Sequence, residues 1–99
     1  METMEIKDNE FLRQFETRIE EELITLEYSL QERKIFLSKL MISDKMKEDG
    51  TLEKFLTGVF DHIEERGRIR VVPTSKEVVK FFRANKSKYS DLLPIGMNI

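Results

Sequence analysis

Few side chains in this sequence could perform covalent chemistry. There is no cysteine, which excludes thiolate nucleophiles, disulfides and cysteine-ligated metals, and His62 is the single histidine. A serine hydroxyl such as that of Ser75 is a weak nucleophile unless a base lies beside it, and nothing in the sequence brings His62 near Ser75. Thr74 and Ser75 fit helix-capping roles better, and His62 fits a half-buried packing role at the margin of an apolar helix stripe. A single histidine without cysteine also argues against a zinc site.

Two groups of basic residues could bind an anion. Lysines flank a glycine turn, where they could hold a phosphate or form a solvated loop; they are Lys45, Lys47 and Lys54 around Asp49-Gly50-Thr51. Arg68 and Arg70 alternate in a strand-like segment, so both are expected on one face, opposite Ile69 and Val71. An anionic ligand or glutamate side chains would serve there as partners.

The composition predicts one globular domain without strong electrostatic attraction to polyanions. The chain has 99 residues, of which 39% are hydrophobic and 36% charged, with 17 Lys and Arg against 19 Asp and Glu. The net charge of −2 argues against a nucleic-acid or anionic-membrane partner. An acidic N-terminus without an apolar core segment, and the lack of a long apolar run, predict a cytoplasmic protein. We expect one domain over residues 1–99, with 1–5 and 94–99 as terminal extensions.

The first half of the chain has the period of β-strands. Residues 11–19 carry Phe11, Phe15 and Ile19 on odd positions, and residues 23–30 alternate apolar with polar side chains. Residues 34–42 are apolar on both parities, which predicts a central strand covered on both faces. The polar links between these segments are short, so we expect three strands in an antiparallel meander.

The second half changes to a helical period. A complete amphipathic stripe predicts a helix that ends at Gly67; its members are Leu52, Phe55, Leu56, Val59, Phe60 and Ile63. A short strand over residues 69–72 ends at Pro73, and a second helix has Val78, Val79, Phe81 and Phe82 on its inner side. Thr74 and Glu77 fit a capping box at its start. The predicted class is α+β with the order β-β-β-α-β-α, and the fourth strand is a parallel crossover over the first helix.

Specific residues give this order a resemblance to the small GNAT-type N-acetyltransferases. The matching positions are weak singly but extend over most of the chain; they are residues 59–67, 71–75, 78–82, 85 and 89–92, with Asn9, Phe15-Glu16, Leu26-Glu27-Tyr28 and residues 35–42 upstream. The resemblance implies a GNAT-like fold that binds acetyl-CoA or CoA and passes the acetyl group to an amine. In that family a glycine-rich turn that opens a helix receives the pyrophosphate, and the preceding strand lines the pantetheine.

The resemblance implies a cofactor site and candidate catalytic residues at particular positions. The cofactor-binding candidates are Leu40, Met41 and Ile42 along the strand, with Lys47, Gly50, Thr51 and Leu52 at the turn. Glu27 and Tyr28 are candidate base and acid near the acyl group, although as residues of a solvated strand face they need no such role. Ser75 falls where the family has a cysteine.

Three departures from the family open an alternative. Where the family has a Gly-x-Gly turn, this sequence has Asp49-Gly50-Thr51, which puts a carboxylate where phosphate would bind unless Asp49 caps the helix. Ser75 stands at the family's cysteine position, and Lys39-Leu40 stand at the positions of its His-Thr pair. The alternative function is a non-catalytic GNAT-like module that binds a protein partner or dimerises. The C-terminal residues 92–99 are unusually apolar, so we expect this tail to dock on its own sheet or on a second copy in a homodimer.

Overall fold

A five-stranded sheet is the centre of the computed structural model, which describes residues 5–19, 21–89 and 92. The strands lie side by side in chain order: β1 (Lys7–Asn9), β2 (Gln14–Ile19), β3 (Glu22–Gln31), β4 (Lys34–Met41) and β5 (Arg70–Pro73). Neighbours are antiparallel as far as β4, and β5 pairs with β4 in parallel. The helices are α1 (Asp44–Glu48), α2 (Thr51–Arg66), α3 (Lys76–Ala84) and α4 (Lys86–Tyr89). The predicted α+β class and its parallel crossover are confirmed.

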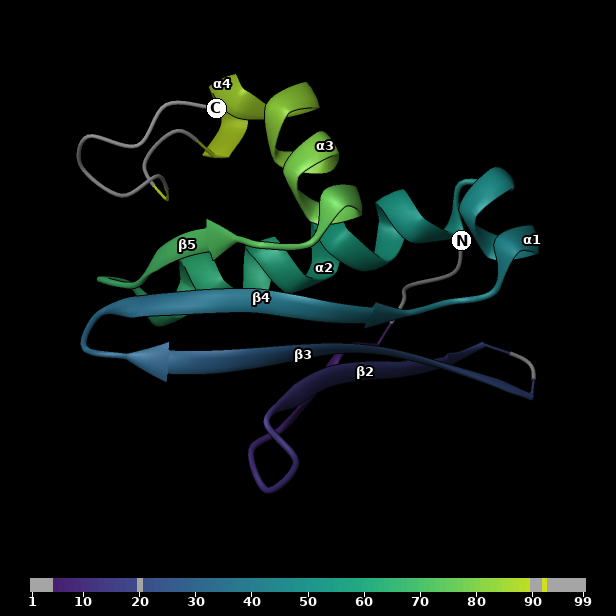
Figure 1. The fold of residues 1–99 in the computed structure, drawn as a ribbon, viewed down its shortest axis with the longest axis horizontal. Helices are drawn as coiled ribbons and strands as arrows, with labels where there is room; N and C mark the ends of the chain where they lie inside the picture. Colours follow the sequence, from purple (N-terminus) through teal and green to yellow (C-terminus); the bar gives the residue numbers. More distant parts are fainter. Residues whose placement is uncertain (1–4, 20, 90–91, 93–99) are drawn as a thin grey trace.

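Helix α2 covers one face of the sheet and supplies much of the core. It lies behind β4 and β5 in Figure 1, with α3 beyond the β5 edge. The six residues of the predicted stripe are all buried, and they share one core cluster with Phe15, Ile24, Leu26, Ile35, Leu37 and Val71. Gly67 ends the helix with φ 71°, as predicted for a C-terminal glycine. The two ends of α2 therefore have fixed positions against the sheet.

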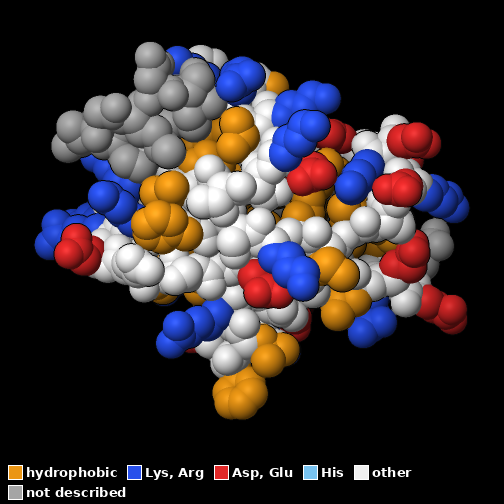
Figure 2. Space-filling view, viewed as in Figure 1, with side chains coloured by type: hydrophobic (Ala, Val, Ile, Leu, Met, Phe, Trp, Pro, Cys, Tyr) orange, Lys and Arg blue, Asp and Glu red, His pale blue; other side chains and the backbone are white. Residues whose placement is uncertain are grey.

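The opposite face of the sheet carries no helix among the described residues. Phe36 and Val72 are half-buried there and Met41 is 52% exposed. Figure 2 views this open face and shows small hydrophobic patches separated by charged and other polar groups. The prediction that residues 34–42 are covered on both faces is therefore wrong.

A β-bulge explains the misleading apolar pattern of β4. Tyr28 pairs with Leu37 but Leu26 pairs with Leu40, so two residues of β4 oppose one residue of β3. The extra residue changes the parity of the strand, and Leu40 returns to the buried face that Leu37 occupies. Ile35, Leu37 and Leu40 thus lie on one face although their parities differ, whereas Phe36 and Met41 lie on the open face.

Three short elements were missed, and one predicted strand starts later than expected. Neither β1, α1 nor α4 is long enough to show a period in the sequence. The predicted strand over residues 11–19 begins at Gln14, because Arg13 has φ 55° and closes a turn after β1. Phe11 consequently lies in that turn, 94% exposed, and the prediction that it belongs to the buried alternation is wrong.

The C-terminal helices join the core through aromatic contacts. Phe60 of α2 has edge-to-face contacts with Phe81, Phe82 and Tyr89, whose ring centroids lie 5.0–5.2 Å away. The Tyr89 hydroxyl donates to Asp61 Oδ1 at 2.9 Å. Leu92 is 5% exposed and belongs to the same core, so this residue of the apolar tail docks on its own chain. Residues 93–99 lie outside the described residues.

Candidate functional site

Strands β4 and β5 separate halfway along β4. They pair from Lys34 with Arg70 to Leu37 with Pro73, and the Thr74 amide and hydroxyl then both donate to the Leu37 carbonyl, at 3.0 and 2.8 Å. Beyond this point the chain turns into α3, whereas β4 continues to Met41. The β4 edge from Ser38 onward thus has no pairing with β5 in the described structure. Leu40, Met41 and Ile42, predicted to line a pantetheine chain, lie along this open edge.

A glycine turn follows β4 and opens α2. Gly50 is the N-cap of the helix with φ 89°, a left-handed conformation that side chains disfavour. The first intrahelical bond runs from the Lys54 amide to the Gly50 carbonyl at 3.3 Å. The amides of Thr51, Leu52 and Glu53 therefore lack intrahelical acceptors, as at any helix start, and the helix dipole favours an anion here. The turn therefore has the free amides of an ordinary helix N-terminus.

Asp49 already fills part of that anion position. Its Oδ1 accepts from the Thr51 amide at 3.0 Å and from the Thr51 hydroxyl at 2.6 Å. These two hydrogen bonds hold the pKa of the Asp49 carboxyl below its ordinary value, and the charges of Lys45 and Lys54 lower it further. Asp49 therefore acts as the capping carboxylate, one of the two arrangements expected from the sequence. The amides of Leu52 and Glu53 stay available to a ligand.

The lysines near the turn are only partly free to bind an anion. Lys47 Nζ lies 3.5 Å from Glu77 Oε2 of α3 and 3.9 Å from Asp44 Oδ1. Lys45 and Lys54 are exposed and close enough to Asp49 to affect its charge. Lys47 thus ties α1 to α3, and Lys45 and Lys54 are the better candidates for a phosphate ligand.

The carboxylate beside Ser75 is a poor base. It is the N-cap of α3, but its side chain caps no backbone amide, and its hydroxyl donates to Glu77 Oε1 at 3.0 Å. The predicted capping box is wrong, since Thr74 instead bonds to Leu37 and the helix starts one residue later. The pKa of Glu77 is lowered by its own amide, by Ser75 and by Lys47, so this carboxylate is a weak base. Activation of Ser75 as a nucleophile has no support in this geometry.

Glu27 and Tyr28 lie on opposite faces of β3. Glu27 is exposed on the open face, and its carbonyl accepts from the Ser38 hydroxyl at 3.3 Å at the bulge. Tyr28 is buried under α2 and its hydroxyl donates to Asp8 Oδ1 at 2.6 Å. Burial and this hydrogen bond raise the pKa of Tyr28 above its ordinary range. The two side chains therefore do not act as an acid–base pair, and only Glu27 stays accessible beside the open edge of β4.

A cluster around Asp8 was missed in the sequence. Asp8 accepts from Tyr28, its Oδ2 lies 3.1 Å from Arg66 Nη1 and 3.8 Å from His62 Nε2, and its side chain is 12% exposed. The His62 ring also stands edge-on to Phe15 at 5.6 Å, as expected for a packing residue. This cluster joins β1, β3 and α2. A three-residue strand gives no periodic signal, so nothing in the sequence marked Asp8.

Arg68 and Arg70 do not alternate along one strand as predicted. Arg68 has φ 59° and lies outside β5, which begins at Arg70. The alternation that would place both side chains on one face therefore does not apply.

Among the described residues there is no group of three or more histidine, aspartate or glutamate side chains that could hold a metal ion. None of the described helices is long and apolar enough to cross a membrane.

The same architecture occurs in a solved structure. It is the solution structure of a Staphylococcus aureus protein described as a "GCN5-like putative N-acetyltransferase", which superposes with a TM-score of 0.70, 22% sequence identity, and coverage of 99% of this chain and 94% of that chain. The two proteins share a fold. This chain is thus GNAT-like in architecture along nearly its whole length. No protein-family model matches the sequence, and no protein of curated function matches it.

Within this GNAT-like fold, the predicted cofactor residues lie along one continuous path of the chain. In the chain, the open edge of β4 is followed by Ile42, α1 and the Gly50 turn, so the strand candidates and the turn candidates lie on either side of α1. The proposed catalytic residues are scattered by comparison. Glu27 flanks the path, Ser75 is engaged with Glu77, and Tyr28 lies in the core.

Proposed function

We propose that this protein binds acetyl-CoA or CoA and transfers the acetyl group to an amine that is still to be identified. The observation that carries the proposal is the separation of β4 from β5 after Leu37, next to the start of α2. In the family that the sequence resembles, pantetheine lies along this strand and the pyrophosphate binds at this turn. An open strand edge offers amide and carbonyl groups to an extended ligand, and a helix N-terminus favours phosphate.

The division of roles follows from the contacts described above. The backbone of residues 40–42 would hold the pantetheine. The amides of Leu52 and Glu53 would bind the pyrophosphate, and the side chains of Lys45 and Lys54 would balance its negative charge. Direct attack by the acceptor nitrogen on the thioester forms the C–N bond, breaks the C–S bond and releases CoA, with no covalent enzyme intermediate. Glu27 is the residue we assign to take the amine proton, because it is the accessible carboxylate beside the open edge.

Calorimetric titration with acetyl-CoA, and separately with CoA, tests the binding step. We expect saturable binding that weakens about tenfold in Gly50→Ala, because a side chain at φ 89° strains the turn that orients the amides. Gly67→Ala is the control: it places a side chain at a second positive-φ glycine, at the other end of α2, where no ligand is proposed. Equal losses in both variants, or no heat and no thermal stabilisation at millimolar ligand, would contradict the proposal.

Asp49→Asn gives a second test of the same site. Replacement of the capping carboxylate by an amide keeps an acceptor for the Thr51 amide and removes a negative charge from the phosphate position. We expect CoA to bind several-fold more tightly to this variant, and the gain to shrink at high salt as the charges are screened. Unchanged affinity would place the phosphates elsewhere.

Acceptor amines can be screened through the release of CoA. Because the chain contains no cysteine, a thiol-reactive dye reports free CoA without a protein background. Glu27→Gln is expected to retain CoA binding and to lose transfer. Binding without transfer to any amine class would favour a carrier or sensor of CoA over an enzyme.

The second candidate function is a non-catalytic GNAT-like module that acts by binding a partner. The observation that favours it is the Asp49 carboxylate, which already occupies the helix N-terminus. For this candidate we expect no response to CoA in either titration. The predicted homodimer through residues 92–99 belongs to this proposal.

A further inference from the structure

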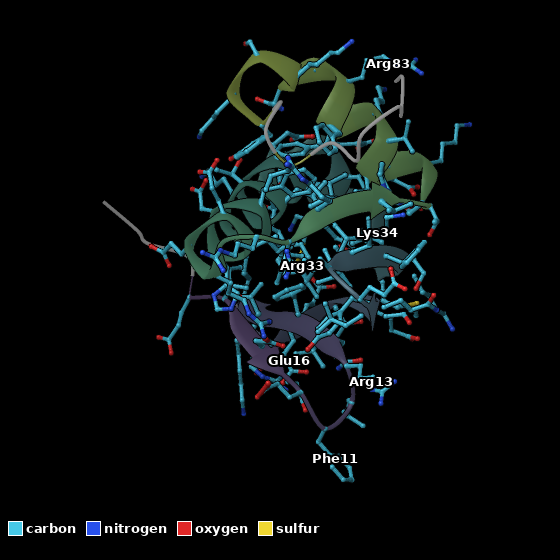
Figure 3. The ribbon with its side chains drawn as sticks, turned by 90° about the vertical axis from the view of Figure 1, so that its left-hand side faces the viewer. Phe11, Arg13, Glu16, Arg33, Lys34 and Arg83 are labelled. Atoms are coloured by element: carbon cyan, nitrogen blue, oxygen red, sulfur yellow. The ribbon has the colours of Figure 1, made fainter. Side chains whose placement is uncertain are left out.

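The turn between β1 and β2, residues 10–13, exposes two large apolar side chains. Phe11 is 94% exposed and Leu12 55% exposed, and we call these four residues the hairpin tip. In Figure 3 the tip protrudes from the sheet and the Phe11 ring points away from the molecule. Scattered apolar side chains are common on protein surfaces, but a phenylalanine with almost no intramolecular contact loses a large burial energy that a partner could restore.

Hydrogen bonds hold the hairpin tip in one conformation. The Asn9 side chain accepts from the Leu12 amide at 3.1 Å, and the Arg13 carbonyl accepts from the Tyr28 amide at 2.9 Å. Arg13 adopts the left-handed conformation that non-glycine residues disfavour, with φ 55°. An ordered turn that presents an aromatic ring loses little conformational entropy on binding, which is a general property of good contact residues.

An open pocket lies directly beside the hairpin tip. Glu10, Arg13, Tyr28 and Leu30 line it. Tyr28 is fixed by Asp8, and Leu30 is a further exposed apolar residue. Leu30 gives the pocket an accessible apolar side chain, and Glu10 and Arg13 add one negative and one positive side chain.

The charges of the pocket are self-complementary. Glu10 and Arg13 are both exposed, and neither side chain has a hydrogen bond or ion pair with another described residue. Because each copy carries both charges, a twofold contact through this pocket can pair Glu10 of one copy with Arg13 of the other and the reverse. This arrangement is an isologous contact, the commonest form of homodimer.

We infer that the hairpin tip and its pocket form a twofold interface between two copies of this chain, in which Phe11 of each copy enters the pocket of the other. The surface involved is small, so the dimer is weak and reversible. A second copy fits better than an anionic membrane, because the hairpin tip carries one acidic and one basic side chain and therefore no net positive charge. The inference does not depend on CoA binding.

Analytical ultracentrifugation over a micromolar to millimolar concentration range tests the interface. We expect the wild-type chain to dimerise reversibly, and Phe11→Ser to raise the dissociation constant about tenfold or more. Leu23→Ser is the matched control, since it removes another exposed apolar side chain from a different part of the sheet and should leave the dimer intact. Circular dichroism should confirm that both variants fold, because neither side chain lies in the core.

Charge-reversal variants give the decisive measurement. A solution of either single variant, Glu10→Arg or Arg13→Glu, should contain monomers. Each substitution places like charges opposite each other across the twofold axis. An equimolar mixture of the two should form a heterodimer, in which every such contact pairs opposite charges. A monomeric wild type at millimolar concentration would overturn the inference, as would a dimer that survives Phe11→Ser. A mixture that stays monomeric would also overturn it, and so would a dimer lost only on truncation of residues 93–99, which would place the interface in the tail.

Discussion

At the scale of single residues, Asp8 makes the most consequential polar contacts in the described structure. One carboxylate accepts from Tyr28 and Arg66 and lies near His62, so three elements meet at a side chain that the sequence left unmarked. Arg66 supplies a positive charge and Tyr28 a neutral donor, and the group is thereby partnered on both oxygens. Such an arrangement stabilises a fold without offering a reactive atom to a substrate.

Asp8→Ala is expected to lower the free energy of unfolding by about 2 kcal/mol. The loss arises because the partly buried Tyr28 hydroxyl and the more exposed Arg66 guanidinium lose their acceptor. Urea denaturation measures it. Asp44→Ala is the control, since the Asp44 side chain is 99% exposed and its contact with Lys47 spans 3.9 Å; we expect a change within about 0.5 kcal/mol. Equal effects would mean that the Asp8 contacts contribute no more than an exposed ion pair.

At the scale of elements, Thr74 marks where the parallel strand pair ends. Its hydroxyl donates to the Leu37 carbonyl at 2.8 Å, beside the amide bond from the same residue. Thr74→Val keeps the shape and removes the donor, so we expect a loss of about 1 kcal/mol in unfolding free energy. Thr74→Ser keeps the hydroxyl and should lose less. A valine variant as stable as wild type would show that the amide bond alone is sufficient.

Long periodic elements could be predicted from the sequence, and short or irregular ones could not. The α2 stripe and the β3 alternation each bury one face, so their periods appear directly in the residue types. The bulge in β4 arises from the pairing of this strand with β3, and the sequence of one strand alone does not reveal that pairing. Because of the bulge, a strand that is buried on one face has the apolar pattern of a strand buried on both. The helix start at Ser75 was misplaced because Thr74 bonds across the sheet instead of along the chain.

The candidate site was predicted in part for the same reason. The path from β4 to the Gly50 turn is continuous in sequence, so a resemblance spread along the chain could locate it. The contacts that decide how it works come from other elements: Glu77 binds Lys47 and Ser75, and Asp8 removes Tyr28 from the acid–base candidates. These partners lie far apart in sequence and have no common spacing.

At the scale of the whole molecule, both tyrosines of the chain report on its integrity at alkaline pH. Burial and a carboxylate acceptor raise the pKa of Tyr28 and of Tyr89, with Asp8 and Asp61 as the respective acceptors. A raised folded-state pKa means that the stabilisation is complete below the unfolded value near 10 and is lost as the pH rises above it. We expect the unfolding free energy to fall with pH above about 10.

Ultraviolet titration of the phenolate band is the measurement. Neither tyrosine should ionise at its ordinary pKa, and phenolate absorbance should appear together with loss of the helical circular dichroism signal. In Tyr28→Phe the alkaline decline in stability should be shallower. Ionisation of both tyrosines near pH 10 in a chain that stays folded would contradict the hydrogen bonds to Asp8 and Asp61.

The parallel pairing of β4 with β5 has a consequence for how quickly the chain folds. Strands β1 to β4 connect through tight reversals, so their partners find each other over short stretches of chain. The pair of Lys34 with Arg70 forms only after the whole of α1 and α2 has been laid down between them, and loop closure of that length is slow. We therefore expect the meander to assemble before β5 pairs with β4, so that the opening between these two strands forms late in folding.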